Sequence, residues 1–170
     1  MIILTLGTIN TPFYRAVDWL QSLLENKLIN EPVLFQYGTT PVNNLKHPLV
    51  TNVKSLKRYE MQQYINKASL VISHAGQGST RMLAEMGARF ILIPRLKRHG
   101  EHIDDHQLIF ARQVEKFGIH YCTEYHQLVR LIKQRPLPYY GQLFDAPLLV
   151  EYLIDHYQGL ESRTYTKANR

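Results

Sequence analysis

The sequence predicts an α/β fold built on a mostly parallel sheet, and three observations lead to this prediction. Short apolar runs rich in β-forming residues alternate with stretches whose apolar residues recur at helical spacing. Several of these runs end at a turn residue, as at Gly7, Gly38 and Pro94. The chain has 170 residues, which suits one domain. Strands that alternate with helices form βαβ units, and the strands of such units lie parallel in one sheet.

The expected elements follow one another with short connections. The strands are expected at Ile2–Leu6, Val33–Tyr37, Leu49–Val53, Leu70–Ile72, Phe90–Ile93 and Ile119–Cys122. The helices are expected at Phe13–Leu28, Arg58–Lys67, Ser79–Gly87, Asp104–Phe117, Glu124–Lys133 and Pro147–Tyr157. We therefore expect one domain over residues 1–157. Residues 158–170 are polar and lack periodicity, so we expect a tail there.

Composition excludes several classes of protein. Hydrophobic residues make up 45% of the chain and charged residues 20%, as in a soluble globular protein. The one cysteine, Cys122, excludes a disulfide framework and a cysteine-based metal or redox motif. No signal peptide is evident at Met1–Leu4, and no apolar run approaches the roughly 18 residues of a membrane-spanning helix. These features predict a cytoplasmic protein.

The charge balance favours anionic partners. The formal net charge is +6, and the densest basic cluster is Arg95, Lys97, Arg98 and His99. Such a cluster suits a nucleotide, an anionic lipid surface or the carboxylate of a uronic acid, although basic residues are often no more than solvated surface. No aromatic-basic RNA motif is present, so nucleic acid is not an expected partner.

Three loops follow the expected strands at the edge where parallel sheets bind ligands: Gly7–Thr11, His74–Thr80 and Arg95–Asp105. In the second loop, Gly76 and Gly78 allow close approach of the backbone to a ligand, while Ser79 and Thr80 open a helix. The start of a helix binds phosphate through free N–H groups, so the loop suits a diphosphate. A tight turn capped by Ser79 is the plain alternative. The spacing matches neither a P-loop nor a dinucleotide fingerprint.

Further polar side chains are expected near the same edge. Glu85 lies about one and a half helical turns beyond Ser79, within reach of a ribose, unless it is an ordinary surface glutamate. His106 and Gln107 are expected in the first turn of a helix, where they could bind sugar hydroxyls. Asp104 or Asp105 could simply cap that helix.

A zinc site is a further alternative for this segment. His102 and His106 are spaced i and i+4 with carboxylates nearby, a set that could hold zinc. No third ligand is set by the spacing, so hydroxyl recognition and helix capping are preferred. We therefore expect no bound metal.

Two of these loops carry a resemblance to a known family. The segments SHAGQGST (73–80) and RLKRHGEHIDDHQ (95–107) resemble the C-terminal domain of glycosyltransferase family 28, and Leu4–Thr8 resembles its first strand and loop. Within the family, the chain looks most like the PssE-type catalytic subunits of bacterial exopolysaccharide and capsule synthesis. Those subunits are similar to the eukaryotic small subunit that makes the second N-acetylglucosamine linkage on dolichol diphosphate. The resemblance covers about residues 1–135.

The resemblance implies the donor-binding half of a GT-B fold, a Rossmann-like sheet with helices on both faces. It implies that a UDP-sugar is the donor and that no cofactor is needed. Diphosphate contacts are implied for Gly7, Thr8, Gly76, Gly78, Ser79 and Thr80. Glu85 would bind the ribose, His106 and Gln107 the hexose, and the backbone of residues 56–58 the uracil.

By the same resemblance, the chain is expected to be the catalytic subunit of an inverting, metal-independent hexosyltransferase. A membrane-anchored partner subunit would bind the lipid-linked saccharide acceptor and hold the chain at the inner face of the cytoplasmic membrane. Candidates for the general base are His74, Glu101 and Asp105, unless the partner supplies it. A UDP-sugar-binding or regulatory module without catalysis is the alternative function.

Overall fold

The computed structural model describes residues 1–42, 45–141 and 143. The expected helix at Pro147–Tyr157, the end of the expected domain and the expected tail lie outside these residues. The strands are β1 (Ile2–Thr5), β2 (Val33–Gln36), β3 (Val50–Val53), β4 (Leu70–His74), β5 (Phe90–Ile93) and β6 (His120–Tyr121). The helices are α1 (Tyr14–Glu25), α2 (Arg58–Ile65), α3 (Gln77–Glu85), the 3₁₀ helix η1 (Lys97–His99), α4 (His106–Glu115) and α5 (Tyr125–Lys133).

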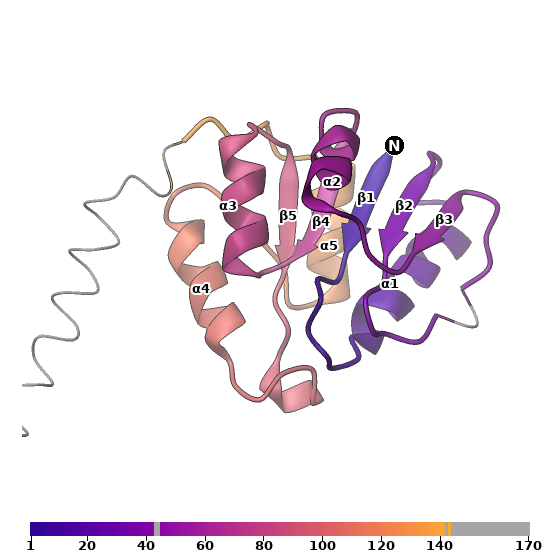
Figure 1. The fold of residues 1–170 in the computed structure, drawn as a ribbon, viewed down its shortest axis with the longest axis horizontal. Helices are drawn as coiled ribbons and strands as arrows, with labels where there is room; N and C mark the ends of the chain where they lie inside the picture. Colours follow the sequence, from indigo (N-terminus) through magenta and orange to yellow (C-terminus); the bar gives the residue numbers. More distant parts are fainter. Residues whose placement is uncertain (43–44, 142, 144–170) are drawn as a thin grey trace, which may run out of the picture.

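The strands form one six-stranded sheet in the order β3-β2-β1-β4-β5-β6. Every pairing in it is parallel, which confirms the expected α/β class. All strands therefore end at the same edge, and the loops after β1, β4 and β5 gather there, at the bottom of Figure 1. The order reverses between β1 and β4, and a parallel sheet opens a crevice at such a reversal.

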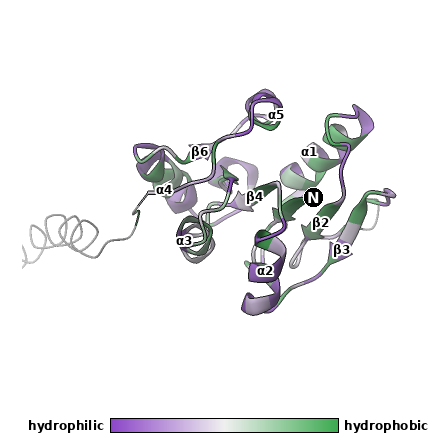
Figure 2. Ribbon diagram, turned by 90° about the horizontal axis from the view of Figure 1, so that it is seen from above, coloured by the Kyte–Doolittle hydropathy of each residue, from purple (hydrophilic) through white to green (hydrophobic). Residues whose placement is uncertain are grey.

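Helices cover both faces of the sheet, as expected for a Rossmann-like fold (Figure 2). Alternate strand residues such as Leu4 and Ile72 pack with α1 and α5 on one face. Their neighbours along the strands, such as Ile3 and Val71, pack with α2, α3 and α4 on the other face. The central strands are thus buried on both sides, which explains why their sequences are continuous apolar runs.

The helix after β4 begins and ends earlier than expected. Gly76 occupies the N-cap position with an extended backbone, so α3 already begins at Gln77. The helix ends at Glu85, because the N–H groups of Gly87 and Ala88 bond back to the carbonyls of Ala84 and Leu83. The strand before it is longer than expected and runs to His74. The turn between β4 and α3 is therefore very short.

The helix after β5 also differs from its expected bounds. It was expected from Asp104 to Phe117, but α4 spans His106–Glu115. Asp104 and Asp105 remain outside it, because Asp105 takes the N-cap position and the Asp104 carboxylate accepts the His106 N–H at 3.1 Å. Among the described residues, no helix is both long enough and apolar enough to span a bilayer.

Candidate functional site

A cavity of about 330 Å³ opens where the strand order reverses. Gly7 and Thr8 line it from the loop after β1, and His74, Gly78 and Ser79 line it from the end of β4 and the start of α3. The structure thus brings together five residues that the sequence predicted for the site. A volume of this size falls within the range of small-molecule sites.

The start of α3 supplies hydrogen-bond donors to this cavity. Backbone N–H groups in the first turn of a helix have no partner within the helix, and in α3 that turn carries Gly78 and Ser79 at the cavity wall. Thr80 differs from its expected role, because its side chain is fully buried and its hydroxyl donates to the Gly76 carbonyl at 3.0 Å. Thr80 therefore closes the first turn instead of offering its hydroxyl to a ligand.

His74 forms the floor of the cavity and is held between two glycines. Its imidazole lies so close to Gly7 and Gly76 that a Cβ at either position would be 2.4 Å from a ring atom. Burial, and then the charge of Arg95, lower the pKa of His74 from 6.5 to about 4, although a hydrogen bond with the Thr5 backbone opposes the shift. The ring is therefore neutral at pH 7.

The opposite wall of the cavity comes from α2 and the segment before it. Leu56, Met61 and Ile65 give this wall an apolar surface, and Arg58 places a positive charge at its rim. Thr5 and Gln36 also line the cavity, where the Thr5 hydroxyl donates to the Gln36 side-chain oxygen at 3.0 Å.

The sequence reasoning assigned no role to Thr5 and Gln36. A signal for them existed, because each is a polar residue in the last position of an apolar strand, and parallel strands end at the ligand-binding edge.

Arg95 has a different role from the one that the basic cluster suggested. Only 1% of its surface is exposed. Its guanidinium donates to the carbonyls of Leu6 (3.0 Å), Thr11 (2.6 Å) and Glu101 (3.2 Å). Such a side chain cannot reach an anionic ligand. Its charge instead ties the loop after β5 to the loop after β1.

Glu101 belongs to the same internal network. Its two carboxylate oxygens each accept a bond of 2.8 Å from the Arg15 guanidinium, and one also accepts the Leu96 N–H. The side chain is almost fully buried. Both oxygens are thus engaged within the loop network, and Glu101 does not line the cavity at the strand reversal, so it is not retained among the candidates for the base.

Side-chain oxygens of Gln107 and Asp105 also accept hydrogen bonds from backbone N–H groups within the loop. Gln107 is buried, and its side-chain oxygen accepts the Arg95 N–H at 3.1 Å. Asp105 accepts the Lys97 N–H at 2.9 Å. Neither residue lines the cavity at the strand reversal. Both therefore stabilise the course of the loop after β5.

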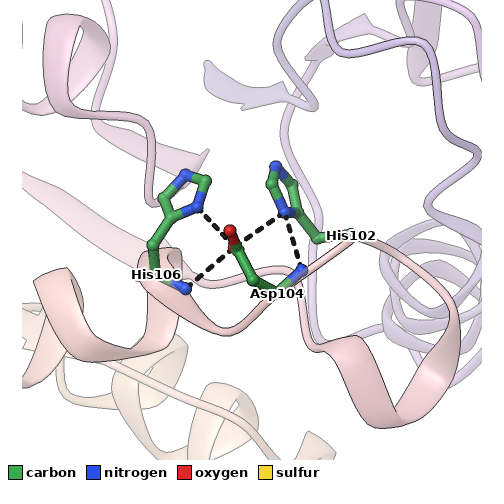
Figure 3. A group of neighbouring side chains, drawn as sticks. All are labelled: His102, Asp104 and His106. Atoms are coloured by element: carbon green, nitrogen blue, oxygen red, sulfur yellow. Dashed lines mark hydrogen bonds and ion pairs between the residues drawn. The ribbon is translucent and has the colours of Figure 1, made fainter.

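His106 lies in a small cluster with Asp104 and His102 (Figure 3). The Nδ1 atom of His106 is in short contact with Asp104 Oδ1, and the Nδ1 atom of His102 lies 3.1 Å from the same oxygen. The two rings are nearly perpendicular, with centroids 4.4 Å apart. The His106 backbone N–H, followed by the two imidazoles, lowers the pKa of Asp104. The cluster supplies the third ligand that the i, i+4 spacing lacked.

The structure does not place Glu85 at the cavity. Glu85 is the last residue of α3, and its carboxylate forms an exposed ion pair with Arg81 at 2.7 Å. Met82, one turn closer to the start of the helix, lines the cavity instead. The predicted helical spacing was correct, but Glu85 is the last residue of α3, and its carboxylate is paired with Arg81 at the surface and away from the cavity.

Comparison with known proteins identifies the family. The sequence model of the glycosyltransferase family 28 C-terminal domain matches residues 1–136. No curated protein matches the chain. A crystal structure described as the glycotransferase of kitacinnamycin has a TM-score of 0.57 and 16% sequence identity. That match covers 95% of this chain but only 38% of the other, and at such identity it shows a shared fold alone. Because the family match extends over most of the sequence, the chain belongs to the glycosyltransferase family 28 C-terminal domain family.

Proposed function

We propose that this chain binds a UDP-sugar in the cavity between β1 and β4 and is the donor-binding, catalytic subunit of an inverting glycosyltransferase. One observation carries the proposal. In a family 28 domain, a cavity at the strand reversal has a helix N-terminus at one wall and an apolar wall opposite. The two walls match the two halves of a nucleoside diphosphate, one anionic and one flat and apolar.

The two walls of the cavity support one orientation of the donor. The N–H groups at Gly78 and Ser79 and the positive end of the α3 dipole favour the diphosphate. Leu56 and Met61 favour the uracil ring and its ribose, and Arg58 adds a cation for the phosphates. The hexose then extends toward the loop after β5, where His106 is exposed.

Transfer requires that the bond between the hexose C1 atom and the diphosphate break as the acceptor hydroxyl attacks from the opposite face. Negative charge grows on the departing UDP. The start of α3 is already oriented to stabilise that charge, so we propose that the leaving group needs no metal ion. The inverted configuration at C1 follows from a single displacement.

The acceptor proton needs a base, and we place that base on a partner subunit. The low pKa of His74 makes it a weak acceptor at neutral pH. Both Glu101 oxygens accept hydrogen bonds from Arg15, and Asp105 accepts the Lys97 N–H. The partner is proposed to be membrane-anchored and to bind a lipid-linked saccharide. The resemblance to subunits of exopolysaccharide and capsule synthesis supports this assignment, which would hold the chain at the inner face of the cytoplasmic membrane.

None of the three candidate bases, His74, Glu101 and Asp105, is well placed to accept a proton. This also favours the second candidate function, a UDP-sugar-binding or regulatory module without catalysis. Turnover separates the two functions. The chain is incubated with a panel of UDP-sugars, with and without membranes that carry its partner, and UDP release is followed. We expect release only in the mixture. Tight UDP binding with no release in either arm would support the module.

The site itself is tested by titrating UDP into matched variants. Gly78→Leu places a large side chain in the cavity, so we expect at least a tenfold weaker affinity, about 1.4 kcal/mol. Glu85→Ala is the control on the same helix, and its affinity should stay within about twofold, because the Glu85 side chain lies outside the cavity. Equal affinities of the two variants would remove this cavity from consideration.

A further inference from the structure

The His102–Asp104–His106 cluster offers the ligand set of a transition-metal site. Its three ligand atoms lie within 4.8 Å of one another. Imidazole nitrogen and carboxylate oxygen are the ligands that zinc accepts in open, three-ligand sites. Figure 3 shows both imidazoles turned toward one carboxylate from either side. We propose that these residues bind a Zn²⁺-class divalent ion, with an open coordination position toward solvent.

One ligand distance of the cluster is already close to that of an occupied site. Zinc bonds of about 2.0–2.1 Å place tetrahedral ligand atoms about 3.3 Å apart. His102 Nδ1 and Asp104 Oδ1 are already 3.1 Å apart. The shorter contact between His106 and Asp104 has to open slightly. Both side chains are about half exposed, at 55% and 51%, so this movement meets little resistance.

The loop around the cluster is held in place on both sides. Glu101 immediately precedes His102, and Gln107 immediately follows His106. Both of these neighbours are buried, one bound to Arg15 and the other to the Arg95 backbone. The backbone of the two histidines is therefore fixed before any ion binds, which lowers the entropic cost of forming the site.

Two cations of this region are already paired with carboxylates. The Arg98 guanidinium, in the same loop, lies 3.0 Å from the Glu124 carboxylate. The Arg15 guanidinium is likewise paired with Glu101. The Asp104 carboxylate therefore faces the two histidines as the local anion, and an ion of charge +2 leaves the occupied site with a net charge of +1.

Occupancy would act on donor binding through His106. A histidine that ligates an ion is not available to a hexose hydroxyl, so the ion should compete with the sugar part of the donor. It should not compete with UDP, whose proposed contacts lie at α3 and α2. This competition rests on the proposed function. The metal site itself does not.

The metal site is tested on the purified, metal-stripped full chain. Zn²⁺ is titrated by calorimetry, and Co²⁺ is used as a probe because its absorption spectrum reports ligand number. We expect one ion per chain and at least tenfold weaker binding in His102→Ala, Asp104→Asn and His106→Ala. His99→Ala is the control, since His99 is exposed in the same loop and lies outside the cluster. Circular dichroism of each variant verifies folding.

Two results would overturn the site: no Zn²⁺ binding by the folded chain, or binding that the cluster variants leave unchanged. A second arm measures UDP and UDP-sugar affinities with and without Zn²⁺. Weaker UDP-sugar binding with unchanged UDP binding supports the competition, and unchanged binding of both ligands rejects it. A chain that binds Zn²⁺ but never UDP would refute the proposed function and leave the metal site standing.

Discussion

The loops after β4 and β5 follow neighbouring strands and end at the same edge of the sheet, yet they use their polar groups differently. The loop after β4 is so short that the start of α3 directs backbone N–H groups to the cavity. The loop after β5 is longer and has to be tied down, so Arg95, Glu101 and Gln107 bind backbone groups and one another. The buried polar side chains of the long loop form the hydrogen bonds that hold the loop in place. Only its exposed polar side chains remain available to bind a ligand.

The largest effect on stability is expected when the buried Arg95 is replaced. Arg95→Met keeps an unbranched apolar stem but removes the guanidinium, which leaves the carbonyls of Leu6, Thr11 and Glu101 without this donor. We expect the free energy of unfolding to fall by about 3–5 kcal/mol in urea denaturation, because several buried carbonyls lose their donor at a cost of about 1–3 kcal/mol each. Lys97→Ala, an exposed change in the same loop, should alter it by less than about 0.5 kcal/mol. Equal effects would mean that the loop does not depend on its buried cation.

A second test measures how stability depends on pH through His74, the last residue of β4. Folding holds the pKa of His74 at about 4, while the unfolded chain binds this proton near pH 6.5. The folded state therefore loses stability as pH falls from about 6.5 to 4, by up to about 3 kcal/mol, and gains no more above that range.

The contribution of His74 is isolated by comparing variants across that pH range. His74→Asn should remove this part of the pH dependence, whereas His120→Asn, at an exposed position, should retain it. The measurement is the free energy of unfolding from urea titrations at each pH. Identical slopes for the two variants would show that His74 does not carry the effect.

The smallest effect is expected from two glycines at the start of α3, Gly76 at its N-cap and Gly78 in its first turn. At Gly76, an added Cβ would lie 2.4 Å from the His74 ring, and Gly7 blocks the ring on its other side. We expect Gly76→Ala to cost about 1–3 kcal/mol of stability through overpacking. At Gly78, an added Cβ meets nothing within 4 Å, so Gly78→Ala should stabilise α3 by about 0.5–1 kcal/mol. A destabilised Gly78→Ala variant would contradict this division.

Prediction from the sequence succeeded where local pattern and position in the fold are enough. Strand and helix alternation predicted the parallel sheet, and the rule for strand ends selected Gly7, His74, Gly78 and Ser79, all of which line the cavity. A glycine-rich turn between a buried strand and a helix has few alternative conformations, so its position in the fold determines what it faces.

Prediction was weaker where the role of a side chain depends on partners far along the chain. The Glu101 carboxylate is paired with Arg15, and the Arg95 guanidinium donates to carbonyls of the loop after β1. Neither pairing leaves a periodic signal in the sequence. Asp104 was considered as a cap, and its place between two histidines became visible only once the backbone of the loop was known.

The order of the strands has a thermodynamic consequence. In the described sheet, β1 and β4 join the first three strands to the last three, and the cavity spans that seam with one wall from each half. A nucleotide bound there holds the two halves against each other, and neither half alone presents the complete site. Ligand at a hundred times its Kd would add about 2.7 kcal/mol to the stability of the whole chain.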